Sequence, residues 1–259
     1  MTLALPLLLE DPRQRAPLEE RVEAALALGV SDPRLGQRSA IAAGSFLYGS
    51  DDGAANEHPL RRLSTGAYEI GVVPVTVSEF APFVPAGYRE RAHWDEEGWA
   101  FLEQNRIDRP RFWGDPAWSL YQAPSQPVVG VSWHEARAFA RSRGLRLPGE
   151  LEWERAARGE DGRAYPWGSE WREGHAHFRG GTRSTLPVGC FPGGRSQHGL
   201  LDASGNIWEW TEDALDENSA LRVARGGGWN AHPPQLRCAN RNAWPKEARF
   251  SNLGFRLAR

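Results

Sequence analysis

Apolar residues recur at helical spacing in four stretches of the chain, which cover residues 17–28, 76–84, 132–144 and 150–158. The third stretch opens with Ser132 and Glu135 in the pattern of a capping box, in which each side chain accepts a hydrogen bond from the other residue's backbone amide. The second is kept short by Pro82, because proline cannot donate a helical hydrogen bond. The sequence therefore predicts four helices, the first of them near the N-terminus.

Strand patterns are confined to short segments, at residues 45–48, 67–73, 222–225 and 254–257. Beyond residue 158 helical periodicity vanishes, and the chain becomes dense in glycine, proline and tryptophan. A few short helices, short strands and much irregular backbone together predict one α+β domain. We expect this domain to cover residues 41–259, with residues 1–40 as a helical extension.

Composition narrows the range of partners. The chain has 259 residues, 40% of them hydrophobic, which is enough for one large core. Its net charge of −2 gives no basic excess, so we expect no nucleic-acid partner. Arginine supplies every basic residue except Lys246, a bias that indicates a GC-rich genome and fits a thermostable protein. Two cysteines, Cys190 and Cys238, are too few for a disulfide framework and favour a reducing compartment.

The first residues are apolar but do not form a signal-peptide pattern. Pro6 interrupts them, no basic region accompanies them, and Glu10 and Asp11 follow directly. No stretch approaches the roughly 20 apolar residues that a membrane helix requires. We therefore expect synthesis in the cytoplasm and no membrane insertion, and leave open an exported or phage-associated form.

The C-terminal segment alternates structure-specifying residues with positions of no common chemistry. The first kind comprises Gly226, Gly227, Gly228, Trp229, Arg237, Arg241, Gly254 and Phe255. The second comprises Ala231, His232, Gln235, Ala243, Trp244, Ala248, Phe250 and Ser251, with asparagines at 230, 240, 242 and 252. Glycines permit unusual backbone, and arginines such as Arg237, Arg241 and Arg249 can hold loop carbonyls and carboxylates. The pattern predicts a rigid loop frame that presents variable side chains.

Several motifs carry a family resemblance. They are Gly49-Ser50, Pro74-Val-Thr76, Pro127-Val-Val-Gly-Val-Ser-Trp133, Arg146-Leu-Pro148, Glu150-Leu-Glu-Trp153, Pro166-Trp-Gly168, Gly205-Asn-Ile-Trp-Glu-Trp210, Arg225-Gly-Gly227 and Leu253-Gly-Phe-Arg256. From about residue 41 onward the chain resembles the formylglycine-generating-enzyme/sulfatase-modifying superfamily. The resemblance implies a C-type-lectin-like α+β fold with much irregular backbone. Within such a fold, we expect Trp153, Trp167, Trp208 and Trp210 to be packing residues.

Members of this superfamily that generate formylglycine carry a pair of cysteines shortly after the Gly-Gly motif, where thiolates bind copper. Here residues 229–237 contain no cysteine, and only Cys238 follows. Relatives that make sulfoxides use a His triad on an additional helical domain, whereas this chain has no histidine before His58. The resemblance therefore favours a protein that is not an enzyme and requires no cofactor. An oxygen-dependent modifying enzyme of the same fold is the alternative.

The ending is most similar to variable proteins of diversity-generating retroelements, which bind ligands through a C-terminal segment rewritten at adenines. This similarity implies a variable region at about residues 222–256 and an unknown macromolecular ligand, expected to be a protein. The implied contact positions are Asn230, Ala231, His232, Gln235, Asn240, Asn242, Ala243, Trp244, Ala248, Phe250 and Ser251. An ordinary C-terminal meander with tolerated substitutions is the other interpretation.

The resemblance also implies a structural calcium ion before the Trp-Glu-Trp motif. The corresponding positions are Asp202, Gly205, Ile207 and Glu209, which offer two carboxylates and two backbone carbonyls. An equally good interpretation is a turn stabilised by Asp202, with Glu209 paired to an arginine. Two further histidines, His175 and His177, are expected to be solvated loop residues.

Overall fold

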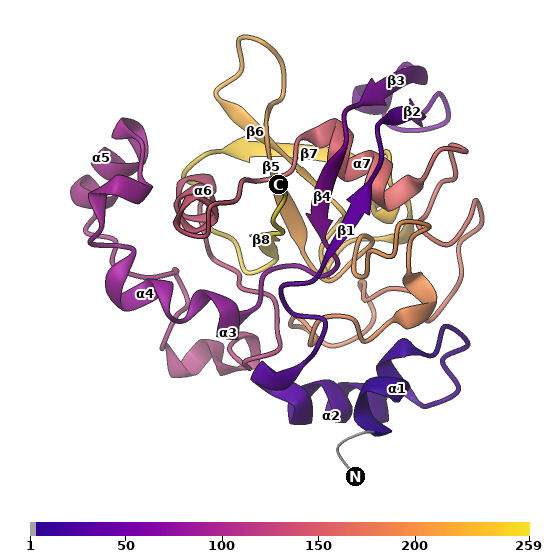
Figure 1. Cartoon of the computed structure of the whole chain (residues 1–259), viewed down its shortest axis with the longest axis horizontal. Coiled ribbons are helices and arrows are strands. Elements are labelled where there is room, and N and C mark those ends of the chain that lie inside the picture. Colours follow the sequence, from indigo (N-terminus) through magenta and orange to yellow (C-terminus); the bar gives the residue numbers. More distant parts are fainter. Residues whose placement is uncertain (1–3) are drawn as a thin grey trace.

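The computed structural model describes residues 4–259 and has an α+β fold built on a small central sheet (Figure 1). Its strands are β1 (Arg38–Ile41), β2 (Gly44–Tyr48), β3 (Arg61–Thr65), β4 (Tyr68–Gly71), β5 (Trp208–Ala214), β6 (Leu221–Arg225), β7 (Arg241–Pro245) and β8 (Leu253–Phe255). The central sheet has the order β7-β6-β5-β8, with β8 parallel to β5 and the other pairs antiparallel. The pairs β1–β4 and β2–β3 form two separate ladders.

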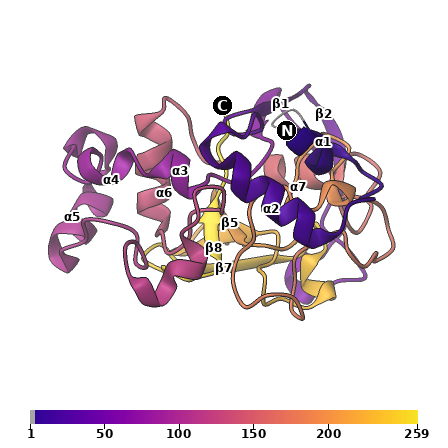
Figure 2. The same ribbon diagram turned by 90° about the horizontal axis from the view of Figure 1, so that it is seen from below.

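The helices lie around this sheet, with α6 and α7 on opposite sides of it in both views (Figures 1 and 2). They are α1 (Ala4–Glu10), α2 (Leu18–Leu28), α3 (Val77–Phe80), α4 (Phe83–Ala86), α5 (Glu96–Asn105), α6 (Trp133–Ser142) and α7 (Glu150–Arg158). All four predicted helices are present, the second of them divided into α3 and α4 around Pro82. The four predicted strand segments also correspond to β2, β4, β6 and β8, which confirms the α+β class.

Capping explains why α6 begins where the sequence predicts. The Ser132 hydroxyl accepts a hydrogen bond from the Glu135 amide at 3.2 Å, and the Glu135 carboxylate accepts one from the Ser132 amide at 2.7 Å. Thr76 and Glu79 form the same reciprocal pair at the start of α3. These bonds satisfy amides that have no partner within the helix.

Two helices were not predicted, for different reasons. Helix α1 contains Pro6, but a proline in the first turn removes no helical hydrogen bond, so it does not break the helix. Helix α5 buries only Gly98 and Leu102, so it has little apolar periodicity to detect. Its start is instead fixed by Asp95, whose carboxylate accepts the Gly98 amide at 2.8 Å.

The largest apolar core lies between the central sheet and α6. The rings of Phe80 and Phe139 stack with centroids 4.9 Å apart, and Phe255 of β8 packs edge-on against both. Gly254 permits this approach, because a Cβ atom there would lie 2.3 Å from the carbonyl oxygen of Val128. The core therefore requires glycine at this position of the Gly-Phe-Arg motif.

The predicted packing role of the tryptophans is confirmed for Trp153, Trp208 and Trp210, which are all buried. The Trp210 indole donates to the Val131 carbonyl at 3.1 Å, so its polar atom is satisfied inside the core. Trp167 is half-buried and packs on Tyr165.

The N-terminal helices pack directly onto the rest of the chain. Helices α1 and α2 lie side by side along one edge of the molecule (Figure 1), and Leu9 and Leu28 form an apolar cluster with Leu186 and Phe191. The Arg21 guanidinium donates to the carbonyl of Cys190. Strand β1 starts at residue 38, so the first sheet pairing lies partly before the predicted domain start at residue 41. Among residues 4–259, no helix is long and apolar enough to cross a membrane.

Candidate functional site

The C-terminal segment is anchored by a fully buried arginine at the end of β6. The Arg225 guanidinium donates to Glu154 and, at 3.2 Å, to Glu150, both on α7. The same guanidinium donates to the carbonyls of Cys238 and Ala239 at 2.7 and 3.1 Å. One side chain thus joins β6, α7 and the stretch that precedes β7, and nearby opposite charges hold the pKa of Arg225 above its usual value against the effect of burial.

A second buried arginine holds the last strand. Arg256 forms a two-pronged ion pair with Glu209, with 2.6 Å between Nη2 and Oε1. Glu209 also accepts the Trp153 indole N–H at 2.8 Å. The remaining guanidinium hydrogens reach the carbonyls of Gly71 and Leu201 at 2.8 and 3.0 Å. The position of Arg256 is therefore defined from all sides.

Three further arginines anchor the irregular part of the segment, as the sequence predicts. Arg237 binds Glu57 at 2.7 Å, Arg241 binds Glu150 at 2.7 Å, and Arg249 binds Glu135 at 3.0 Å. Each carboxylate comes from a part of the chain distant in sequence. The glycine turn that precedes them requires its residue type, since Gly227 has φ of +76° and a Cβ atom would meet Leu236 at 2.6 Å.

The eleven predicted contact positions differ in exposure. Five are exposed, namely Asn230, His232, Gln235, Asn242 and Phe250. Five are half-buried, namely Asn240, Ala243, Trp244, Ala248 and Ser251. The eleventh, Ala231, is only 4% exposed and packs in a cluster with Tyr165 and Leu236, so its prediction as a contact residue is wrong. The sequence pattern could not reveal this burial, because Tyr165 is far from Ala231 in sequence.

Trp244 is a packing residue as much as a surface residue. Its ring lies edge-on to Trp208 and Trp210, with centroids 5.5 and 6.2 Å apart, and it packs against the main core. The ring of Phe250 lies edge-on to that of Trp244, with centroids 5.7 Å apart, and Phe250 is 40% exposed. The amide of Asn240 is tied to Glu57 at 3.1 Å. Of these aromatic anchors, only Phe250 presents a largely free face.

A cavity of about 570 Å³ adjoins the C-terminal segment. It is lined by residues 179–183 together with Trp229 and Asn230. Asn230 accepts a hydrogen bond from Asn252 at 2.8 Å, and the Trp229 indole donates to the carbonyl of Ser251 at 3.3 Å. The ring of His232 lies 3.2 Å from the Arg179 guanidinium. Asn230 and His232 thus join the cavity to the C-terminal segment. We call the cavity lining and the five exposed C-terminal positions together the display surface.

The display surface has a positive cavity. Arg179 and Arg183 line it, and its lining includes no carboxylate. Guanidinium groups bind carboxylates and phosphates through paired hydrogen bonds, so the cavity suits an anionic group of a ligand. The sequence alone does not indicate residues 179–183, because Arg-Gly-Gly-Thr-Arg is an ordinary loop pattern that lies well before the C-terminal segment.

The two cysteines lie apart in the structure. Cys190 and Cys238 are buried free thiols in separate apolar clusters, one beneath α2 and the other beneath α7. Burial raises the pKa of Cys238 to about 12 and also raises that of Cys190, so both stay protonated at neutral pH. The prediction of solvated loop histidines is wrong for His177, which is buried and hydrogen-bonded to the Ser184 carbonyl at 2.8 Å.

Three of the four residues considered for calcium, Asp202, Gly205 and Glu209, have ligand oxygens that bind other groups. Both Glu209 oxygens bind Arg256, the Gly205 carbonyl accepts the Ile207 amide at 2.9 Å, and Asp202 accepts the Gly189 amide at 2.7 Å. Burial raises the pKa of Asp202 to about 6. This arrangement does not offer the open cluster of anionic oxygens that calcium prefers. Calcium binding stays a prediction, and the alternative pairing of Glu209 with an arginine is present.

The fold, together with the frame of paired arginines at residues 225, 237, 241, 249 and 256, defines a C-type-lectin-like domain of the sulfatase-modifying type. Residues 28–259 match the family described as sulfatase-modifying factor enzyme 1-like domain, and the chain belongs to this family. An inactive C-alpha-formylglycine-generating enzyme 2 from Bos taurus is 32% identical over an alignment of 263 positions, gaps included. The match covers 83% of this chain and 85% of that protein.

Other relatives differ in length and in kind. A hercynine oxygenase from Mycobacterium tuberculosis is 33% identical over 233 residues, and the match covers 78% of this chain but only 55% of that protein. Among solved structures, PvdO from Pseudomonas aeruginosa has 25% identity and a TM-score of 0.68, with 88% of this chain and 95% of PvdO covered. Treponema denticola variable protein 1 has 22% identity and a TM-score of 0.65, with 85% and 94% covered, and shows a shared fold.

Replacing Trp244 and Phe250 separately by alanine tests their different surroundings. We expect Trp244→Ala to lower the free energy of unfolding by about 2–4 kcal/mol, because it removes packing against two buried tryptophans. Phe250→Ala should change it by less than about 1 kcal/mol, since its ring has a free face. Urea denaturation measures both values. Equal losses would contradict the division between packing and display.

Asp202→Asn tests the titration of the buried carboxyl group. Because the pKa of Asp202 is raised to about 6, the folded protein keeps a proton that the unfolded chain releases near pH 4. The free energy of unfolding of the native protein should therefore fall as the pH rises through about 6. Asparagine does not titrate and tolerates the φ of +54° at this position. The stability of the variant relative to wild type should thus increase by up to about 3 kcal/mol between about pH 4 and pH 7.

Urea denaturation in the presence of a chelator measures this difference. A difference that is constant with pH would contradict the raised pKa. A rise in melting temperature on addition of calcium to the native protein, lost in Asp202→Asn, would instead support the calcium prediction.

Proposed function

We propose that this chain is a non-enzymatic ligand-binding protein whose display surface is diversified by a retroelement. The observation that carries the proposal is the separation of roles within residues 222–256. Buried or paired arginines hold the backbone, whereas Asn230, His232, Gln235, Asn242 and Phe250 extend into solvent. Substitution at such exposed positions leaves the core contacts unchanged.

The proposed ligand is a protein surface that carries a carboxylate or another anionic group. The cavity beside Arg179 and Arg183 would receive this group, and Phe250 would contribute an apolar contact at the edge of the display surface. A scaffold fixed by ion pairs loses little conformational entropy on binding, which favours affinity. Binding in this proposal requires no cofactor, nucleic acid or membrane, and the protein is made in the cytoplasm.

Two of the comparisons support this proposal. Treponema denticola variable protein 1 shares the fold, so the fold is suited to a variable protein. The Bos taurus relative is named as an inactive enzyme, which shows that a family member at 32% identity can lack the catalytic activity. The buried, separated thiols of Cys190 and Cys238 agree with a protein that does not perform copper-thiolate chemistry.

An oxygen-dependent modifying enzyme is the second candidate. The observation in its favour is the 33% identity to a hercynine oxygenase, which covers about half of that protein. If such an activity exists, the pocket beside Trp229 is where a substrate carboxylate would bind. Any metal would have to be held by residues other than the two buried thiols.

Comparing the terminal coding segment among independent isolates tests the main proposal. We expect substitutions to concentrate at the five exposed positions, with Arg225, Arg237, Arg241 and Arg256 unchanged, because the latter hold the backbone. We also expect the neighbouring DNA to contain a second copy of this coding segment, which differs mainly at adenines, and a reverse transcriptase gene. Substitutions spread evenly over frame and display positions would contradict diversification. Oxygen consumption by the purified protein with copper and a cysteine-bearing peptide would instead support the enzyme.

A further inference from the structure

A buried histidine lacks hydrogen-bond partners. His134, in the first turn of α6, is only 2% exposed, and within the described residues neither ring nitrogen has a hydrogen-bond partner. The Oδ1 atom of Asp95 lies 3.9 Å from Nδ1 of His134, too far for a hydrogen bond. The Asp95 carboxylate already caps α5 and binds Arg137. A buried imidazole without partners is costly, so this one calls for a physical explanation.

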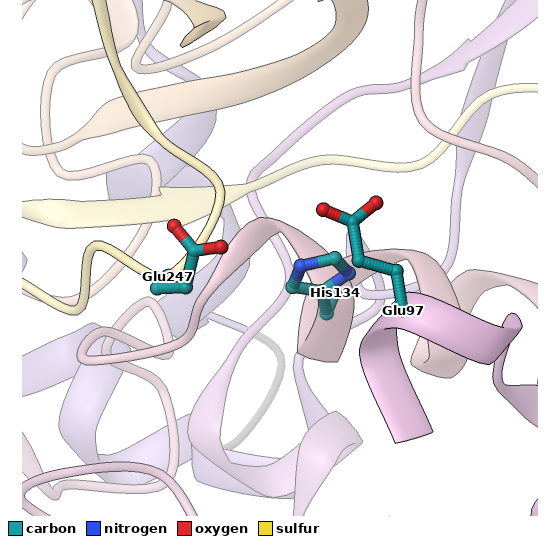
Figure 3. A group of neighbouring side chains, drawn as sticks. All are labelled: Glu97, His134 and Glu247. Carbon is teal, nitrogen blue, oxygen red and sulfur yellow. The ribbon is translucent and has the colours of Figure 1, made fainter. Parts of the chain in front are cut away.

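Two further carboxylates lie around this ring. Glu97 comes from α5 and Glu247 from the loop after β7, and Figure 3 shows His134 between them. One donor atom from each of the three residues lies within 4.8 Å of the other two. Three separate elements therefore bring an imidazole and two carboxylates to one place.

The elements that carry the three groups are fixed to one another. The carbonyl of Lys246 accepts the Trp133 amide at 2.9 Å, so the loop that carries Glu247 is bonded to the start of α6. Asp95, which caps α5, accepts a hydrogen bond from Arg137 of α6 at 2.6 Å. The backbones of the three elements are thus held together before any ion arrives.

We propose that Glu97, His134 and Glu247 form a binding site for a divalent transition metal, with Zn²⁺ the best-suited ion. Zn²⁺ accepts both imidazole nitrogen and carboxylate oxygen as ligands, whereas Ca²⁺ and Mg²⁺ prefer oxygen alone. Ligand atoms on a tetrahedral zinc ion lie about 3.4 Å apart. Rotation of the exposed Glu97 and Glu247 side chains brings the donors to this spacing, and water completes the coordination.

A cation already neutralises part of the site. The ammonium group of Lys246 binds the Glu97 carboxylate and lies 5.7 Å from the centre of the Trp133 ring. Zinc must displace this ammonium group from the Glu97 side chain, which is 55% exposed. Lys246 therefore competes with the metal and lowers its affinity.

The site would control the shape of the display surface. Glu247 lies three residues before Phe250, within the proposed variable region, whereas Glu97 lies on α5, far from it in sequence. A bound metal would tie the loop at residues 246–250 to α5 and α6 and reduce its motion. This inference goes beyond ligand display, and its test does not depend on any ligand.

Calorimetric titration of the untagged full-length protein with Zn²⁺ tests the site, with Co²⁺ as a spectroscopic probe. We expect one zinc ion per chain, a higher melting temperature with zinc, and visible Co²⁺ absorption typical of tetrahedral coordination. His134→Gln and Glu247→Gln should each weaken zinc binding by at least about tenfold and remove the Co²⁺ bands. Lys246→Met should tighten binding.

Glu96→Gln is the matched control, because Glu96 is also a first-turn carboxylate of α5 but is not one of the three ligands. It should bind zinc as the native protein does. The Glu247→Gln variant keeps the test valid if His134→Gln fails to fold, since Glu247 is exposed. Absence of zinc binding, or equal binding by the native protein and Glu247→Gln, would overturn the proposal.

Discussion

Buried pairing of arginine with glutamate is the constraint on which the C-terminal half of this protein depends. Arg225 and Arg256 are both inaccessible to solvent, and each is matched by a buried carboxylate, Glu154 or Glu209. Removing one partner of such a pair leaves an uncompensated charge and costs about 3–5 kcal/mol. The pairs also specify geometry, because a planar guanidinium fits its carboxylate and carbonyl partners in one orientation. The irregular stretches on either side of β7 are therefore fixed with little regular secondary structure.

This arrangement separates the residues that determine the fold from those that face solvent. The display surface combines exposed side chains of unrelated chemistry with a cavity whose arginines suit an anionic group. Relatives with the same fold include an oxygenase and an inactive enzyme, so the fold alone does not decide the function. The proposed binding role rests on local features, namely two buried and separated thiols and exposed side chains beside a frame of paired arginines.

Local sequence signals predicted much of the fold. The capping box at Ser132 placed the start of α6, and the role of Arg237, Arg241 and Arg249 followed from their donor groups. Contacts between residues far apart in the chain could not be predicted from local sequence signals. The partner of Arg237 is Glu57, 180 residues away, and Ala231 is buried by residues that no local pattern connects to it. The role of residues 179–183 in the cavity could not be predicted either, because it depends on contacts with residues distant in sequence. Helix α5 was not predicted because it buries little apolar surface.

A stability measurement on every single substitution of residues 222–256, by protease resistance of displayed variants, tests the central claim most directly. The account predicts losses of about 3–5 kcal/mol at Arg225 and Arg256. At Asn230, His232, Gln235 and Asn242, most substitutions should change stability by no more than about 0.5 kcal/mol. Losses at these exposed positions as large as those at the two arginines would contradict it.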